Sequence, residues 1–284
     1  LSTELSYKLF SNSLSQNLNK IFFLHGNGFP PYAYYDFLDK LSFSGDVFAM
    51  YQKPFLPTNI EPSSIYGWNI FKEDAINFLK KNNLKNSVGI GHSMGAVLIL
   101  VIEIQNPGTF KKIFLLDPVI TSRFKSILYR ILLKLNLIDR FHPMILRTNK
   151  KKMIYNTKEE IYKSYRSKNV FSKINNENLN HYINSIIEEK DERFKIKISK
   201  KWENTIYRNG SLYDYMIWNN IYKVKTPVYI ITPKNGEFGH FNYGSYLKRK
   251  NNKFINLKVN KATHLFPLER PKKTAELITS NINL

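Results

Sequence analysis

Ser93 is the central residue of the pentapeptide Gly-His-Ser-Met-Gly, and its hydroxyl is the best candidate nucleophile in the chain. A short apolar run that is compatible with a strand precedes the pentapeptide, and a longer run that is compatible with a buried helix follows it. A strand that turns into a helix within one or two residues strains the backbone, and Gly91 and Gly95 leave room for the bend. We therefore expect Ser93 to lie at the apex of this turn with its hydroxyl exposed.

A serine nucleophile needs a base, a carboxylate that orients the base, and hydrogen-bond donors for the charge that develops on the substrate oxygen. His264 is the candidate base, because it lies between the strand pattern Phe254–Val259 and an expected C-terminal helix, Lys272–Asn281. The loop His25–Pro30 follows an apolar strand and contains two glycines, so its backbone N–H groups can lie beside a neighbouring strand end. The candidate donor loop, nucleophile and base thus follow one another along the chain in an order that permits acyl-transfer chemistry.

The chain resembles the α/β-hydrolase superfamily. The resemblance rests on four segments in the expected order, HGNGFP at 25–30, GHSMG at 91–95, LLDP at 115–118 and THLFPLERP at 263–271. It implies a doubly wound, mostly parallel, eight-stranded sheet. It also implies that Ser93 is the nucleophile, that His264 is the general base, and that the backbone N–H groups of Asn27 and Met94 form the oxyanion hole. The side chains expected to bind substrate beside these positions are His25, Phe29, His92 and Phe266.

Two carboxylates are candidates for the acid of the triad. The resemblance places the acid after the strand Pro227–Thr232, where Glu237 stands in place of the usual aspartate. A glutamate can hold His264 in one tautomer and stabilise the imidazolium. Asp117 ends the preceding strand and is the alternative, because some members of the superfamily carry the acid there; otherwise it caps a loop ahead of Pro118. The sequence favours Glu237.

Seven segments have strand patterns: 5–11, 20–24, 47–51, 87–90, 113–116, 228–231 and 254–259. The hundred or so residues between the fifth and sixth of them are too many for an ordinary crossover. We predict a core of residues 1–118 and 227–284 and a helical cap, residues 119–226, inserted after strand 6 of the eight-stranded fold. Apolar residues at helical spacing from Phe124 to Leu135 predict its first helix, and 159–165 and 179–189 predict further helices. We expect the first helix to pack over the active site rather than to touch an anionic membrane.

The composition excludes several classes of function. The 284 residues carry a net charge of +21, but the lysines are spread in twos and threes without a recognition motif, so no specific nucleic-acid binding is expected. No spacing of ligand residues resembles a zinc site, and no phosphate-binding loop is present, so no metal or cofactor is expected. There is no cysteine, and no apolar run is long enough to span a membrane. The N-terminus lacks signal-peptide features, which favours the cytoplasm, although the chain begins at Leu1 and a removed leader stays possible.

The sequence thus predicts a cap-bearing serine hydrolase that cleaves an ester or related acyl bond of a small, largely apolar substrate through an acyl-enzyme. An anionic group on the substrate is expected to be tolerated at the mouth of the pocket, because the segment 119–226 contains 23 Lys and Arg against 10 Asp and Glu. Two alternatives stay open. One is a small-molecule-binding scaffold with little turnover, and the other is a C–C bond hydrolase or a haloperoxidase-like activity without a cofactor. The oligomeric state is also open.

Overall fold

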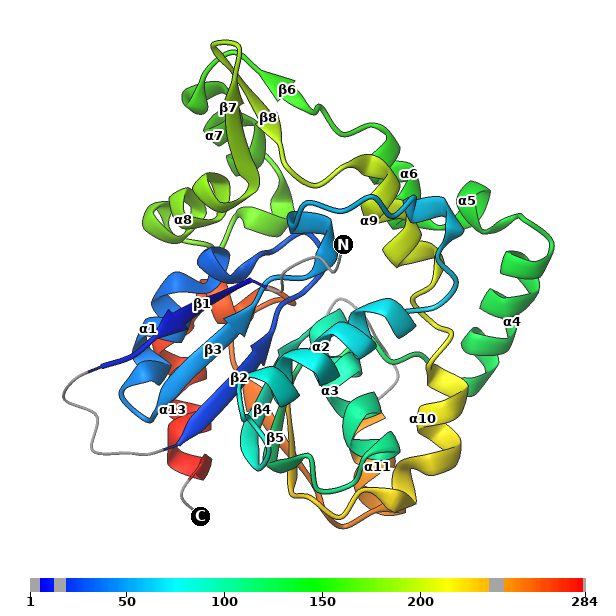
Figure 1. The fold of residues 1–284 in the computed structure, drawn as a ribbon. Coiled ribbons are helices and arrows are strands. Elements are labelled where there is room, and N and C mark those ends of the chain that lie inside the picture. The colour runs from blue at the N-terminus through cyan, green and yellow to red at the C-terminus, as the bar shows by residue number, and fades with distance from the viewer. Residues whose placement is uncertain (1–5, 13–18, 235–242, 283–284) are drawn as a thin grey trace.

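A seven-stranded sheet forms the centre of the protein in the computed structural model, which describes residues 6–12, 19–234 and 243–282 (Figure 1). The strands are β1 (Tyr7–Phe10), β2 (Lys20–Leu24), β3 (Asp46–Met50), β4 (Ser87–His92), β5 (Phe110–Leu116), β9 (Val228–Pro233) and β10 (Phe254–Val259). Their order in the sheet is β1-β3-β2-β4-β5-β9-β10. Only β1 runs antiparallel to its neighbour, β3. The sheet contains the seven predicted segments, and no eighth strand extends it within the described residues.

Helices cover both faces of this sheet, as expected for parallel strands joined by crossovers. On one face α1 (Tyr35–Ser42) packs against α13 (Pro271–Ile282). On the other, α2 (Asn69–Lys81) packs against α3 (Met94–Gln105), and α11 (Tyr243–Lys250) lies against β10. The helix α3 is buried on every side because it lies between the sheet and its neighbours, which explains its continuous apolar sequence. The predicted doubly wound, mostly parallel fold class is therefore confirmed, with seven strands among the described residues in place of the predicted eight.

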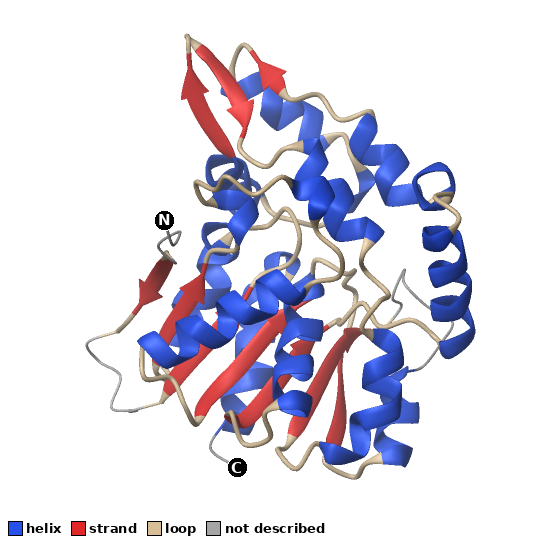
Figure 2. Cartoon of the chain, turned by 45° about the vertical axis from the view of Figure 1, so that its right-hand side comes forward, coloured by secondary structure: helices blue, strands red, loops and turns tan. Residues whose placement is uncertain are grey.

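The inserted segment, residues 119–226, connects β5 to β9, which are neighbours in the sheet. Its helices are α4 (Arg123–Lys134), α5 (Ile138–Phe141), α6 (Pro143–Asn149), α7 (Lys158–Arg166), α8 (Asn176–Ile186), α9 (Lys200–Arg208) and α10 (Asp214–Asn220). It also contains a three-stranded antiparallel sheet of β6 (Ile154–Tyr155), β8 (Arg193–Ile196) and β7 (Ile187–Lys190), which Figure 2 shows at the tip of the molecule. The segment is therefore not wholly helical.

The predicted helix 179–189 ends early for a local reason. The helix α8 stops at Ile186, and the chain continues as β7 into a tight turn at Asp191 and Glu192. Both turn residues have positive φ, 51° and 55°, the conformation that matches the twist of a two-residue hairpin. Pairing of β7 with β8 therefore replaces the last helical turn that the sequence pattern indicated.

The first helix of the inserted segment is formed as predicted, but it faces the other way. Its apolar side chains Phe124, Ile127, Leu128 and Ile131, and Leu135 just beyond it, are 48–76% exposed. The expectation that this row packs over the active site is wrong. Among the described residues, no helix combines the length and the apolar character needed to cross a membrane.

Candidate active site

Ser93 lies between β4 and α3 in a conformation that L-residues rarely adopt, with φ 56° and ψ −116°. The two glycines of the pentapeptide are required by close backbone contacts. A Cβ at Gly91 would lie 2.4 Å from the carbonyl oxygen of Gly95, and a Cβ at Gly95 would lie 2.2 Å from the carbonyl oxygen of Leu24. The first turn of α3 therefore packs directly on the end of β2, and the half-buried Ser93 is held at the apex of the turn.

His264 and Asp117 form a short, mostly buried pair. The Nδ1 of His264 lies 2.7 Å from Oδ2 of Asp117, and the two side chains are 13% and 9% exposed. Asp117 follows the last residue of β5, and His264 lies in the loop after β10. Because a carboxylate only accepts, Nδ1 of His264 carries the proton, which leaves Nε2 of the neutral ring able to accept one. Of the two predicted acids, the structure pairs Asp117 with His264; Glu237 lies outside the described residues.

Through Tyr34, His92 connects the loop His25–Pro30, here called the oxyanion-side loop, to the backbone of His264. The Tyr34 hydroxyl accepts from the Gly26 N–H at 3.2 Å and donates to Nδ1 of His92 at 2.7 Å. The other ring nitrogen, Nε2 of His92, donates to the carbonyl oxygen of His264 at 2.9 Å, because a carbonyl can only accept. Burial lowers the pKa of His92 well below its ordinary value and keeps the ring neutral.

The loop that carries Asn27 lies beside the nucleophile. A Cβ at Gly26 would lie 3.3 Å from Cβ of Ser93, so the loop passes directly beside the side chain of Ser93. Met94 begins α3, and the first N–H groups of a helix have no acceptor within the helix. The loop that carries Asn27 and the N-terminal end of α3 therefore both lie beside Ser93.

The four residues predicted to bind substrate have different surroundings. His25 is 2% exposed and both its ring nitrogens bond to backbone groups, Nδ1 donating to the carbonyl of Gly26 and Nε2 accepting from the N–H of Gln52. His92 is 1% exposed and Phe266 is fully buried. These three side chains are therefore buried and are not exposed at the surface of the site. Phe29 is half-buried and packs on Tyr182 of α8, with ring centroids 4.7 Å apart.

The inserted segment reaches the same loop through a charged cluster. Oε1 of Glu203, on α9, is 3.2 Å from the position of a Cβ on Gly28. Lys151 bonds both carboxylate oxygens of Glu203 at 2.9 Å, and the two side chains are 13% and 9% exposed. Burial, and then the charge of Glu203, raises the pKa of Tyr207. The Asn27 amide lies near this hydroxyl, yet neither amide atom has a hydrogen-bond partner among the described residues.

Comparison with known proteins rests on the structure alone, because no family model and no curated protein sequence matches the chain. The structure is similar to that of the peroxisomal α/β-hydrolase Lpx1 from Saccharomyces cerevisiae, with a TM-score of 0.76 and 17% identity over 100% of this chain and 83% of that one. It is similar to E-2-(acetamidomethylene)succinate hydrolase, with a TM-score of 0.78 and 14% identity over 99% and 100% of the two chains. It is also similar to a thioesterase domain from the curacin biosynthetic pathway, with a TM-score of 0.74 and 13% identity over 98% and 99%. The chain has the α/β-hydrolase fold.

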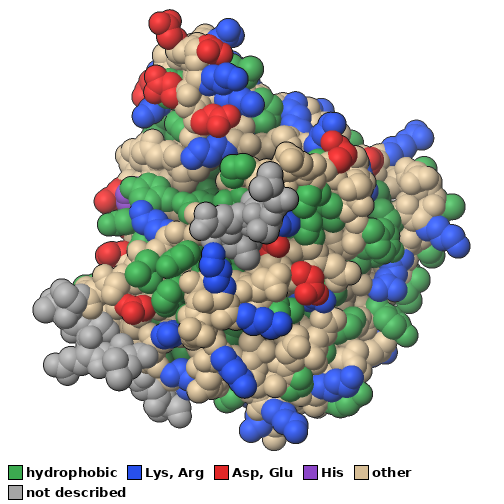
Figure 3. All heavy atoms as spheres, in the orientation of Figure 1, with side chains coloured by type: hydrophobic (Ala, Val, Ile, Leu, Met, Phe, Trp, Pro, Cys, Tyr) green, Lys and Arg blue, Asp and Glu red, His purple; other side chains and the backbone are tan. Residues whose placement is uncertain are grey.

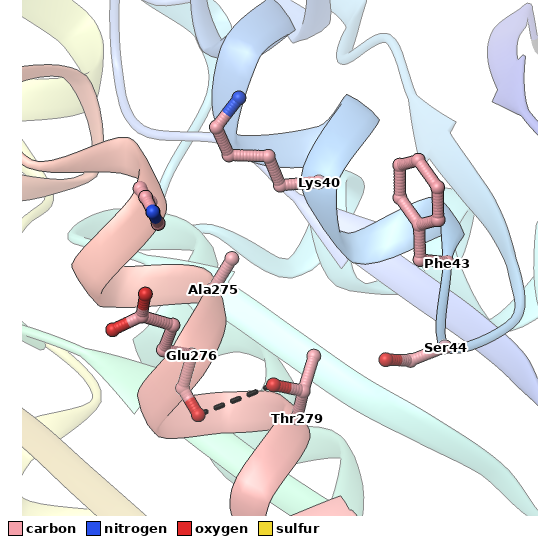
Figure 4. A pocket seen from close by; sticks show the side chains of 7 residues that line it. Lys40, Phe43, Ser44, Ala275, Glu276 and Thr279 are labelled. Carbon is pink, nitrogen blue, oxygen red and sulfur yellow. Dashed lines mark hydrogen bonds between the residues drawn. The ribbon is translucent and has the colours of Figure 1, made fainter.

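In an α/β-hydrolase fold the carboxyl ends of the parallel strands carry the site, and Ser93, Asp117 and His264 all follow such ends. A surface hollow between α1 and α13 lies elsewhere (Figure 4). It is lined by Lys40, Phe43, Ser44, Lys272, Ala275, Glu276 and Thr279. Ser44 precedes the amino end of β3, so this hollow belongs to the opposite edge of the sheet and is not part of the site.

Several residues around the site have no signal in the sequence. Tyr34 was missed because it lies in the short helix η1 (Pro31–Tyr34), 58 residues from the His92 that it contacts. Glu203 and Lys151 were missed because they meet the loop only through the folding of the inserted segment. Within the described ranges, Asp36, Glu177 and His181 bring possible metal-ligand atoms within 4.8 Å of one another where α1 and α8 meet.

Proposed function

We propose that the protein is a serine hydrolase that cleaves an ester or related acyl bond through an acyl-enzyme. The observation that carries the proposal is the bond between His264 and Asp117, together with the strained apex position of Ser93 beside two sources of backbone N–H donors. In this proposal Ser93 is the nucleophile, His264 is the base, and Asp117 is the acid. Asp117 thus replaces Glu237, which the sequence favoured, as the proposed acid of the triad.

The proposed reaction follows from the tautomer of His264. The Oγ of Ser93 attacks the carbonyl carbon of the substrate while its proton passes to Nε2 of His264, and Asp117 stabilises the imidazolium. The N–H groups of Asn27 and Met94 bind the oxyanion of the tetrahedral intermediate. The bond to the leaving group then breaks, and the leaving group takes the proton from Nε2. Water attacks the acyl-enzyme by the same route, releasing the acid and restoring the hydroxyl of Ser93.

We propose that the inserted segment acts as a cap that selects the substrate. Phe29, Phe171 and Tyr182 form an aromatic wall beside the loop, with ring centroids of Phe29 at 6.3 Å and 4.7 Å from the other two. The Glu203–Lys151 pair and the Tyr207 hydroxyl add polar groups over Gly28 and Asn27. These surroundings favour a small substrate with an apolar acyl part and a hydrogen-bonding or charged group. The row of leucine and isoleucine on α4 does not contribute, because it faces outward.

The binding-only alternative rested on the irregular turn around Glu237, which would leave His264 without an orienting acid. The contact with Asp117 removes that argument, since His264 has a carboxylate partner without Glu237. Hydrolysis of a carbon–carbon bond stays compatible with the same three residues, and substrate screening distinguishes it from ester cleavage.

A screen of short- and medium-chain esters with the wild type and Ser93→Ala tests the proposal. We expect the wild type to hydrolyse at least one neutral ester and Ser93→Ala to lose about 10³-fold or more in kcat, since removal of a triad nucleophile costs this much or more. Ser167→Ala, at an exposed serine of the inserted segment, is the matched control and should behave as the wild type. Equal rates for Ser93→Ala and the wild type would refute the mechanism.

A further inference from the structure

The helix α4 has its apolar face turned away from the protein. Phe124, Ile127, Leu128 and Ile131, followed by Leu135, recur at the spacing of a single helical stripe. Their side chains are 76%, 56%, 48%, 49% and 58% exposed. A helix on the surface of a globular protein normally buries its apolar stripe and exposes its polar side. This helix does the reverse.

Polar groups attach α4 to the rest of the inserted segment. The hydroxyl of Ser126 donates to the carbonyl of Ser211 at 3.2 Å, and Nη2 of Arg130 donates to the carbonyl of Leu212 at 2.9 Å. The Tyr129 hydroxyl donates to the carbonyl of Tyr207. These three hydrogen bonds hold one side of α4 against the segment 207–212, so the fold determines that the apolar stripe points outward.

The apolar surface continues beyond α4. Phe141 at the end of α5 is 58% exposed and Leu146 in α6 is 44% exposed. We call the seven side chains Phe124, Ile127, Leu128, Ile131, Leu135, Phe141 and Leu146 the α4 face. Figure 3 shows hydrophobic and basic side chains gathered together at the edge of the molecule where Figure 1 places α4. Exposed apolar side chains that gather at one edge of a molecule are typical of interaction surfaces.

The charge around the α4 face is strongly positive. From Arg123 to Lys150 the chain has seven Lys and Arg and one acidic residue, Asp139. That single carboxylate is already bonded to Arg208, whose Nε lies 2.9 Å from Asp139 Oδ1. On the helix itself, Arg123, Lys125 and Lys134 are exposed and flank the apolar stripe. The face therefore presents apolar side chains within a basic border.

We propose that the α4 face binds the surface of a membrane that contains anionic lipids. An apolar helical face with basic flanks is the arrangement that lies in the plane of a lipid interface, with its apolar side chains among the acyl chains and its cations at the headgroups. A second copy of this chain fits less well, because it would bring two basic borders together in molecules that each carry a net charge of +21. This proposal does not depend on the proposed hydrolase activity.

The contacts of α4 connect this helix to the surroundings of the candidate active site. The Tyr129 hydroxyl bonds the backbone of Tyr207, and the side chain of Tyr207 lies near Asn27 in the oxyanion-side loop. A membrane bound at the α4 face would therefore contact a helix that is hydrogen-bonded to the part of the inserted segment over that loop.

Vesicle flotation with the whole chain tests this proposal. The vesicles are pure phosphatidylcholine, or phosphatidylcholine with one third phosphatidylglycerol. We expect the wild type to float with the anionic vesicles, to bind the neutral ones at least about tenfold more weakly, and to dissociate as salt is raised. The double variant Phe124→Ser/Ile131→Ser keeps every Lys and Arg, so a loss of binding of about tenfold or more would isolate the apolar contribution.

The control removes two exposed apolar side chains away from the α4 face. Phe43→Ser/Ile154→Ser changes residues that are 54% and 49% exposed, and it should float as the wild type does. Thermal unfolding checks that both double variants are folded. Absence of wild-type binding to anionic vesicles would overturn the proposal, as would equal binding of Phe124→Ser/Ile131→Ser. A stable dimer in sedimentation that the same variant abolishes, without vesicle binding, would assign the α4 face to a second copy instead.

Discussion

Asp117 and His264 lie 147 residues apart in the chain, yet their side chains meet at 2.7 Å. The two residues follow β5 and β10, with β9 between those strands in the sheet. The carboxylate therefore reaches the base across the strand that leads toward the other predicted acid, Glu237. The proposed mechanism therefore depends on the carboxylate of Asp117.

Asp117→Asn is predicted to lower kcat by about 10³- to 10⁴-fold with little change in KM, because the amide no longer stabilises the imidazolium or the correct tautomer of His264. Steady-state kinetics on the best ester of the screen measures this. Glu237→Gln is the matched comparison and should change kcat by less than about threefold, because the proposal gives Glu237 no part in the reaction. A large loss in Glu237→Gln and a small one in Asp117→Asn would return the role of the acid to Glu237.

Tyr34→Phe is predicted to lower both stability and kcat. The change leaves Nδ1 of His92 and the N–H of Gly26 without their partner, which costs about 1–3 kcal/mol of unfolding free energy. Because His92 also holds the backbone of His264, a displaced base should lower kcat by about 10- to 100-fold. Urea unfolding and ester kinetics measure the two effects. Tyr32→Phe, in the same short helix, is the control; a matching loss there would mean that the hydroxyl of Tyr34 has no special role.

Gly95→Ala is predicted to be strongly destabilising, because the added methyl group would lie 2.2 Å from the carbonyl oxygen of Leu24. Backbone cannot move aside as a flexible side chain can, so we expect a loss of about 3 kcal/mol or more. Gly210→Ala is the milder comparison, since its methyl group would approach the carbonyl oxygen of Tyr207 only to 3.3 Å. Denaturant unfolding of both variants measures the difference, and equal stabilities would show that α3 does not pack on β2 as described.

Glu203→Gln is predicted to destabilise the inserted segment by about 3 kcal/mol, because it leaves the mostly buried ammonium group of Lys151 without its counter-charge. The double variant Glu203→Gln/Lys151→Met should recover part of this loss, since no unpaired charge then remains. A double-mutant cycle of unfolding free energies measures the coupling. Additive losses would show that the two side chains do not act as a pair.

The buried His25 is expected to lower the free energy of unfolding of the protein in acid. Burial lowers the pKa of His25 from 6.5 to about 4, so the unfolded chain binds the proton more tightly than the folded one. The stabilisation is fully present above pH 6.5 and is lost as pH falls toward 4, by about 3 kcal/mol in total. Burial raises the pKa of Asp214 to about 7, which acts in the opposite direction over the same range. The measure is therefore the difference between wild type and His25→Gln in urea unfolding at several pH values; a pH-independent difference would contradict it.

The sequence predicted the parts of the site that depend on local pattern. The strand–glycine–serine–glycine–helix pattern located Ser93, because the turn is built from five consecutive residues. The position of His264 followed from the order of motifs. The acid could not be chosen in this way, because Asp117 and Glu237 both follow strands, and only the three-dimensional sheet decides which one His264 meets.

The helix α4 shows a second limit of sequence reasoning. Periodicity established that Phe124 to Leu135 form one apolar stripe, but it does not say which way the stripe points. The direction is decided by the hydrogen bonds of Ser126, Tyr129 and Arg130 to residues about eighty positions further along the chain. The Glu203–Lys151 pair over Gly28 could not be predicted either, because neither residue belongs to a sequence motif and the two meet only in the folded chain.

Labelling with a fluorophosphonate probe, followed by intact-protein mass spectrometry and peptide mapping, tests the central claim most directly. The account predicts one adduct per chain, on Ser93, formed at least about 100-fold more slowly in Asp117→Asn and at the wild-type rate in Glu237→Gln. An unlabelled wild-type protein, or an adduct on a residue other than Ser93, would contradict it.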